Sequence, residues 1–184
     1  PGLTFRESLY NGVASDRINR QFRFCPHSDG MFNIGSLSYH IGEEDRHHGY
    51  YAVGYALGSS PSETSADKTF NYALWTLIEQ PLLHVGESHL GAMWQGGTSP
   101  ASRSTCRHYW GAGLIWSNIP PRMTQVGLVV NRALYADGRE TDVELTGSFP
   151  VCNHFTLQPA VHCINTNGNY TAAAQLRAIL EFGN

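Results

Sequence analysis

Histidines beside carboxylates are the residues of this 184-residue chain with the clearest capacity for chemistry. The segment from His84 to His89 holds two imidazoles and the carboxylate of Glu87, groups that can bind zinc and activate water. A spacing of five places His84 and His89 on opposite faces of a strand and on different faces of a helix. The spacing therefore argues against a metal site.

A second histidine pair, His47-His48, follows the polar run Glu43-Glu44-Asp45-Arg46. Such a run is typical of a solvated loop between two strands. Clustered imidazoles beside carboxylates also titrate between neutral and endosomal pH, so the pair is a candidate pH sensor.

Cys106-Arg107-His108 brings a thiol nucleophile and an imidazole two residues apart, which places both on one face of a strand. Catalytic Cys–His pairs are usually assembled from separate elements and oriented by a third group. The chain also lacks a nucleophile elbow, a Walker loop and a dinucleotide fingerprint. We therefore expect no catalytic residue, no metal ligand and no cofactor, and a protein that is not an enzyme.

Aromatic side chains in the middle of the chain suggest a stacking platform for a sugar or a single-stranded base. The contributing residues are Arg103, Arg107, Trp94, Tyr109, Trp110 and Trp116. Trp110 and Trp116 share an alternation phase with Leu114, which predicts that both are buried in a core. Trp94 lies beside Gly96-Gly97 and is the candidate exposed binding residue.

The four cysteines, Cys25, Cys106, Cys152 and Cys163, form no CxxC pair and have no regular metal-ligand spacing, which argues against structural zinc. Cys152 and Cys163 are close enough in sequence to face each other across a hairpin. Buried free thiols are the alternative, and the sequence leaves the disulfide state open.

Charge and hydropathy patterning argue against two classes of partner. Charged residues make up 15% of the chain and the formal net charge is −3, whereas an average soluble domain is about 25% charged. Such a surface offers no basic field for nucleic acid or anionic lipid. No apolar run approaches the roughly 20 residues of a membrane-spanning helix, and Pro1-Gly2 opens directly into alternating sequence without a signal core. We expect no nucleic-acid partner and no membrane insertion.

Alternation with a period of two dominates the elements that must position these residues, for example over 37–41, 51–57, 126–130 and 141–145. This period predicts half-buried strands. Turn-forming clusters separate them, and Asp137-Gly138 is the strongest hairpin signal because both residues tolerate the positive φ of a tight primed turn. The segments 69–79 and 172–182 fit a helix or a strand, and we predict a strand for the second because its surroundings are β. The pattern predicts an all-β fold, an antiparallel multi-stranded barrel or sandwich.

The first two dozen residues have only short apolar positions between polar turns. They would be stable if three copies wound about a common axis. We therefore divide the chain into a shaft-like segment, 1–24, and a globular β head, 25–184.

These features resemble the cell-attachment fibre proteins of reoviruses, the sigma C type of avian and bat orthoreoviruses. The resemblance rests on Gly2-Leu3-Thr4-Phe5, Leu9, Gly12-Val13, Phe24-Cys25, Ile119-Pro120 and the closing stretch 168–183. It implies a homotrimer in which a short triple β-spiral carries a Greek-key β-barrel head, located on the virion surface in the outer capsid. The implied function is binding of a host-cell receptor, either a protein or a glycan.

Two other classes of function fit the sequence. A monomeric carbohydrate-binding module or lectin, secreted or extracellular, explains the aromatic residues and polar loops. A small secreted hydrolase would need a site assembled from distant histidines and carboxylates.

Overall fold

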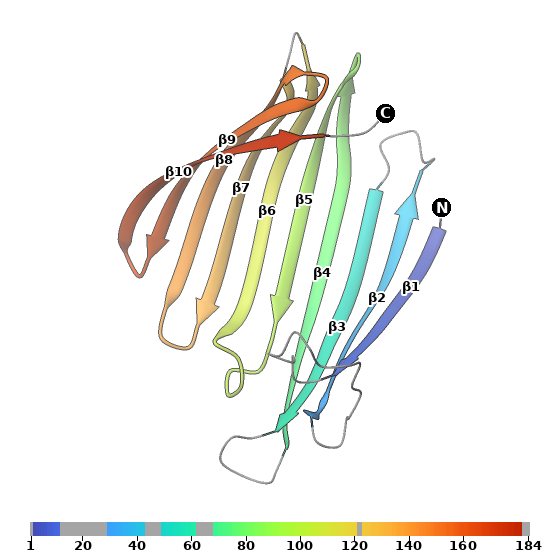
Figure 1. Cartoon of the computed structure of the whole chain (residues 1–184), viewed down its shortest axis with the longest axis vertical. Helices are drawn as coiled ribbons and strands as arrows, with labels where there is room; N and C mark the ends of the chain where they lie inside the picture. Colours follow the sequence, from blue (N-terminus) through green and yellow to red (C-terminus); the bar gives the residue numbers. More distant parts are fainter. Residues whose placement is uncertain (1, 12–28, 43–48, 62–67, 121–122, 182–184) are drawn as a thin grey trace.

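The structure is a computed structural model that describes residues 2–11, 29–42, 49–61, 68–120 and 123–181. Ten strands form one antiparallel sheet in which every strand pairs with its neighbours in the sequence (Figure 1). The strands are β1 (Gly2–Asn11), β2 (Met31–Ile41), β3 (Gly49–Pro61), β4 (Lys68–Val85), β5 (Ser88–Thr98), β6 (Cys106–Ile119), β7 (Met123–Tyr135), β8 (Arg139–Cys152), β9 (Phe155–Thr166) and β10 (Asn169–Leu180).

Short connections explain why the strand order follows the chain. The links 86–87, 153–154 and 167–168 are so short that the two strands which each of them joins pair with one another. Gly86 has a φ of 61°, and Asn167 and Gly168 have φ values of 53° and 95°. Glycine and asparagine are the residues that adopt this left-handed region most readily, so these turns follow from local sequence.

The predicted all-β class is confirmed, and the predicted strand at the C-terminal end is β10. The ambiguous segment 69–79 is also a strand, part of β4. The Greek-key order is not found among the described strands, whose order is sequential, and the sheet is not closed. Alternation reports which residues share a face of a strand, but it carries no information about which strands pair.

The hairpin predicted at Asp137-Gly138 joins β7 to β8, but neither residue adopts positive φ. The neighbouring turn supports it: the backbone N–H of Arg139 donates to Asn167 Oδ1 at 2.8 Å, and the N–H of Asn167 donates to the Arg139 carbonyl at 3.1 Å. A Cβ at Gly138 would come within 2.4 Å of the Asn167 side chain. The glycine is therefore needed for close approach of two turns.

Part of the segment predicted to be shaft-like belongs to the sheet. Residues 2–11 form β1, which pairs with β2 from Gly2 opposite His40 to Asn11 opposite Met31. Residues 12–24 lie outside the described residues. The division into a shaft and a head stays a prediction.

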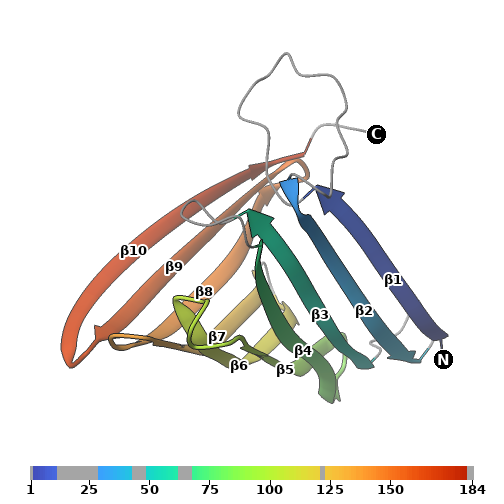
Figure 2. The same cartoon turned by 90° about the horizontal axis from the view of Figure 1, so that it is seen from below.

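The sheet is bent into an open trough whose two edges are β1 and β10 (Figure 2). Register shifts between Pro81 and Leu83 in β4, at Cys106 in β6 and at Pro150 in β8 mark irregular pairing, and such bulges bend strands.

The sheet is a single layer, and little of it is buried. Among the described residues, the only buried apolar side chains are Ala52 and Ala160. Large apolar side chains that usually form a core are therefore at the surface of the sheet.

Candidate functional site

One face of the sheet is apolar across its whole width. Residues directly opposite each other in neighbouring strands lie on the same face, so the register defines rows. One row crosses all ten strands through Leu3, Tyr39, Tyr51, Ile78, Trp94, Ala112, Val130, Val143, Cys163 and Ala172. We call the side that carries this row the apolar face.

The neighbouring row, one residue further along each strand, lies on the other side and has a different character. It passes through Thr4, Ser38, Ala52, Leu77, Gln95, Gly111, Asn131, Asp142, Ile164 and Thr171. Hydroxyl, amide, carboxylate and small side chains predominate. We call this side the polar face.

Side chains on the apolar face are strongly exposed. Leu114, Leu128, Leu145 and Val161 oppose one another on β6 to β9 and are 47%, 49%, 54% and 57% exposed. Contiguous exposed apolar patches of more than a few hundred Å² are rare on proteins that work alone in water. Such a face is typical of a surface that contacts a protein partner, a ligand or a membrane.

The polar face lies on the hollow side of the trough. Along β6, Tyr109, Gly111 and Ile115 of the polar face are half-buried or buried, whereas Leu114 and Trp116 of the apolar face are exposed. Because the sheet is a single layer, this difference in burial between its faces arises where side chains converge on the concave side of the bend. The connection between β5 and β6 lies on the same side, because Asn71 of the polar face donates from Nδ2 to a carbonyl there at 3.2 Å (Figure 2).

A hydrogen-bonded group of three side chains lies at the centre of the polar face. Gln95 Nε2 donates to the hydroxyl of Tyr109 at 2.5 Å, and that hydroxyl donates to Asn131 Oδ1 at 2.7 Å. Gly111 lies between them, and a Cβ there would come within 2.4 Å of Asn131 Oδ1 and 2.9 Å of Gln95 Nε2. The absent side chain at Gly111 provides the space in which the three meet.

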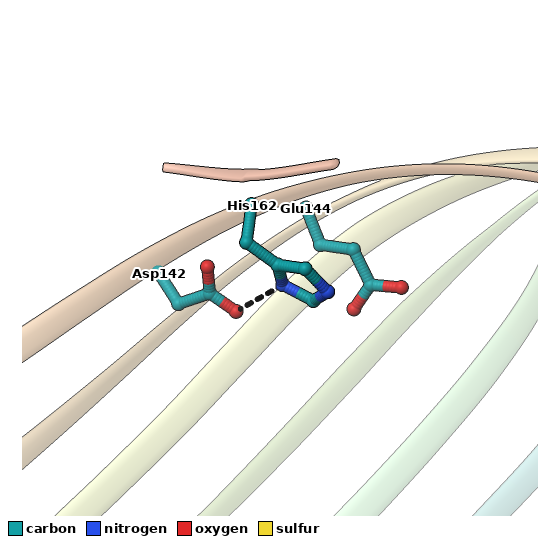
Figure 3. Close-up of side chains that lie close together, drawn as sticks. All are labelled: Asp142, Glu144 and His162. Carbon is teal, nitrogen blue, oxygen red and sulfur yellow. Dashed lines mark hydrogen bonds and ion pairs between the residues drawn. The ribbon is translucent and has the colours of Figure 1, made fainter. Parts of the chain in front are cut away.

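Asp142, Glu144 and His162 continue this polar strip onto β8 and β9. Asp142 is opposite Asn131, and Glu144 is opposite His162. Nδ1 of His162 lies 3.2 Å from Oδ2 of Asp142, and the imidazole lies between the two carboxylates in Figure 3. One possible metal-ligand atom from each residue lies within 4.8 Å of the other two. A mixed imidazole and carboxylate set of this kind can hold a divalent cation.

The hydrogen-bonded group around Tyr109 and the cluster around Asp142 interact electrostatically. Partial burial raises the pKa of Tyr109, and the negative charge of Asp142 raises it further. The phenol therefore stays protonated and available as the donor to Asn131 at neutral pH.

The three tryptophans considered in the sequence, Trp94, Trp110 and Trp116, all lie on the apolar face, whereas Trp75 lies on the polar face. Trp94 is 40% exposed, as predicted, and its indole stacks on Trp110 with ring centroids 6.0 Å apart. The predicted burial of Trp116 is wrong, since it is 43% exposed. Trp116 and Leu114 lie on one face, as their alternation predicts, but no second layer formed by the described residues covers that face.

The sequence argument about His84 and His89 is also wrong. They do not lie along one strand but face each other across the turn at 86–87, with ring centroids 6.1 Å apart. An odd spacing places two residues on opposite faces only within a continuous strand. No third ligand joins them in the clusters found among the described residues.

Cys106 and His108 do not form a catalytic pair. The register shift sets Cys106 opposite Tyr135 but His108 opposite Leu134, so they no longer share a face. Nδ1 of His108 lies 3.0 Å from the hydroxyl of Thr98. The thiol donates to the His108 carbonyl at 3.5 Å.

The described cysteines, Cys106, Cys152 and Cys163, are free thiols. Cys152 is opposite Phe155 and Cys163 is opposite Val143, so the two do not face each other across the hairpin. Both are exposed, whereas the free-thiol alternative assumed burial. Cys25 and the candidate pH sensor His47-His48 lie outside the described residues.

Sequence reasoning missed the cluster of Asp142, Glu144 and His162. The alternation of Asp142 and Glu144 around Val143 places both carboxylates on one face of a strand, and this signal was present in the sequence. The third member is separated by a turn and lies opposite Glu144 only through the register of β8 and β9.

Comparisons with known proteins identify no relative: no family model, curated protein or solved structure matches the chain. The part of the chain that the structure describes contains no helix of the length and apolar character needed to cross a bilayer.

Proposed function

We propose that this chain forms part of the wall of a membrane pore, with its apolar face against lipid and its polar face along an aqueous path. The observation that carries the proposal is the contrast between the two faces. An uninterrupted apolar row crosses ten strands and is covered by no layer within the described part of the chain, while the adjacent row on the other side is mostly polar or small. Membrane-spanning strands have this alternation, apolar toward lipid and polar toward water.

The lengths of the strands also support a membrane-spanning sheet. The strands contain between 10 and 18 residues, and about 9–11 residues in a tilted strand cross the hydrocarbon core of a bilayer.

The edge strands β1 and β10 then need partners. A bilayer supplies no hydrogen-bonding groups, so each unpaired backbone N–H or C=O in it costs several kcal/mol. Their outer backbone groups pair with no strand among the described residues. We propose that further strands of the assembled pore pair with both edges.

This proposal departs from the expectation, drawn from charge and from the length of apolar runs, that the chain does not enter a membrane. Neither criterion detects a strand in which only alternate residues face lipid, because the intervening polar residues interrupt every apolar run.

The tryptophans provide a direct test. Trp116 lies on the apolar face and is exposed, whereas Trp75 is opposite Gly97 on the polar face and is half-buried. Two variants each keep one of these residues and replace the other three tryptophans with phenylalanine. In vesicles containing lipids with brominated acyl chains, we expect strong quenching of Trp116 and weak quenching of Trp75.

Aqueous iodide should give the opposite order, with Trp75 quenched more than Trp116. Equal quenching of both residues by the brominated chains would contradict the two-faced arrangement in the bilayer. A chain that stays in the aqueous fraction when the vesicles are floated would overturn the proposal. Entry of small polar solutes into vesicles that carry the chain tests the pore itself.

Receptor binding by a trimeric viral fibre head is a second candidate, and one observation favours it. The Trp94 and Trp110 rings are stacked with an interplanar angle of 10°, and Trp94 is exposed. An exposed aromatic pair of this kind can stack against a sugar. Retention on a glycan array that is lost in Trp94→Ala, with a solution mass of three chains, would favour this candidate over the pore.

A further inference from the structure

We propose that Asp142, Glu144 and His162 bind a divalent transition-metal ion, with Zn²⁺ as the best-matched probe. The site lies on the polar face over β8 and β9 and does not depend on the proposed pore function. Its three donor groups come from two adjacent strands whose register is continuous from Glu140 opposite Thr166 to Thr146 opposite Ala160. The donors are thus held by paired backbone and not by a loop.

The distances suit first-row metals. Two ligands about 2.1 Å from a tetrahedral zinc ion lie roughly 3.4 Å apart, and Nδ1 of His162 is 3.2 Å from Oδ2 of Asp142. The third donor comes from Glu144, and all three donor atoms lie within 4.8 Å of one another. In Figure 3 the Glu144 carboxylate lies on the side of the imidazole away from Asp142. An ion held by Nδ1 of His162 and Oδ2 of Asp142 would therefore need the flexible Glu144 side chain to turn toward the Asp142 side of the ring.

Charge and solvation favour a cation at this place. Asp142 and Glu144 project from the same face of one strand, and neither carboxylate forms an ion pair with a lysine or arginine of the described residues. Oδ1 of Asp142 is buried and accepts no hydrogen bond, although buried carboxylate oxygens normally have partners. A metal ion would compensate two negative charges and bind unsatisfied acceptors.

Ligand chemistry selects the class of metal. An imidazole favours zinc, copper, iron or nickel over magnesium and calcium, which prefer oxygen ligands alone. The side chains of His162 and Asp142 are 19% and 22% exposed, so an ion can reach them from the hollow of the trough. Three protein ligands leave a fourth position for water, as in open zinc sites.

A protonated His162 between two carboxylates is the competing explanation, and it needs no metal. The two explanations predict opposite responses to pH. Metal binding requires a neutral imidazole and therefore weakens on acidification. A protonated imidazole bridge would instead strengthen.

The test measures Zn²⁺ affinity of the full chain in detergent or vesicles by competition with a zinc dye, at pH 7.5 and 5.5. Glu144→Gln and His162→Asn each remove one ligand. Glu140→Gln is the matched control, because it lies on the same strand and face and accepts only from the Thr166 hydroxyl at 3.3 Å. We expect the two ligand variants to weaken zinc binding about tenfold or more and the control to leave it unchanged.

Binding should also weaken at pH 5.5, and Co²⁺ should give the intense visible absorption of a four-coordinate ion in the parent chain but not in Glu144→Gln. Equal affinity in the parent and both ligand variants would overturn the site. So would an absence of zinc binding at 100 µM by a chain whose circular dichroism shows a folded sheet. Stability that rises on acidification with no response to zinc would assign the cluster to a protonated bridge.

Discussion

The two faces of the sheet are built from the same strands, yet different interactions hold them. On the apolar face, Leu128 and Leu145 oppose each other and are about half-exposed, so their contribution depends on what surrounds the sheet. On the polar face, Tyr109 and Asn131 are joined by a hydrogen bond of 2.7 Å, so their contribution is internal. The stability of the apolar face therefore depends on the environment outside the sheet, whereas hydrogen-bonded partners within the sheet stabilise the polar face.

A lysine introduced on each face in turn should reveal the difference between the two faces most strongly. Leu128 and Gln125 are both exposed residues of β7, on the apolar and the polar face respectively. In vesicles, Leu128→Lys should lower the free energy of unfolding by about 2–4 kcal/mol because the ammonium group is placed in hydrocarbon. Gln125→Lys should leave it nearly unchanged. Urea unfolding followed by tryptophan fluorescence measures both, and similar losses would mean that the faces do not differ in environment.

Adding one methyl group should distinguish tight packing from open packing. A Cβ at Gly111 would overlap Asn131 Oδ1, whereas the nearest atom to a Cβ at Gly96 is 3.4 Å away, an ordinary contact. We expect Gly111→Ala to cost about 1–3 kcal/mol through overpacking. The control Gly96→Ala should cost much less. Unfolding in urea again provides the measurement, and a neutral Gly111→Ala would show that the polar group rearranges freely.

Removing the hydroxyl of Tyr109 on the polar face should cost more than removing that of Tyr39 on the apolar face. Tyr109→Phe loses a donor to Asn131 and an acceptor for Gln95, so we expect a cost of about 1 kcal/mol. Tyr39 lies on the apolar face, is 40% exposed and forms no hydrogen bond through its hydroxyl in the described structure. Tyr39→Phe is therefore the matched control. A thermal melt that shifts equally for both variants would contradict the internal network.

The smallest effect should appear in the alkaline titration of Tyr109. Burial first, and the charge of Asp142 second, raise its pKa above the ordinary value. The unfolded chain ionises this phenol at lower pH than the folded chain does. The resulting stabilisation is therefore complete below about pH 10 and is lost as the pH rises further.

Asp142→Asn removes the second cause, so the pKa of Tyr109 should fall but stay above its ordinary value. The difference in absorbance at about 295 nm between this variant and the same variant with Tyr109→Phe isolates the one phenol. An unchanged pKa would mean that Asp142 does not act on Tyr109.

Much of the secondary structure could be predicted from the sequence because alternation is a local property. Leu114 and Trp116 share a phase that places them on one face of a strand, and Asn167-Gly168 and Asp137-Gly138 mark turns. The same local information could not say that the face carrying Trp116 has no second layer over it. Burial was therefore predicted for a side chain that is 43% exposed.

The candidate metal site was likewise predictable only in the part that depends on local sequence, and the rest depends on strand pairing. Asp142 and Glu144 were readable as two carboxylates on one face, because residues two apart in a strand point the same way. Only the register of β8 and β9 brings His162 opposite Glu144, and a shift of one residue would turn the imidazole to the other face.

The sequence by itself determined the strands, the turns and the two-residue period that separates apolar from polar side chains, because these depend on neighbouring residues. The tertiary structure alone decided the strand order, the single-layer trough and the meeting of His162 with the two carboxylates. Those features depend on which strands pair and in what register, and pairing joins residues that are distant in the chain.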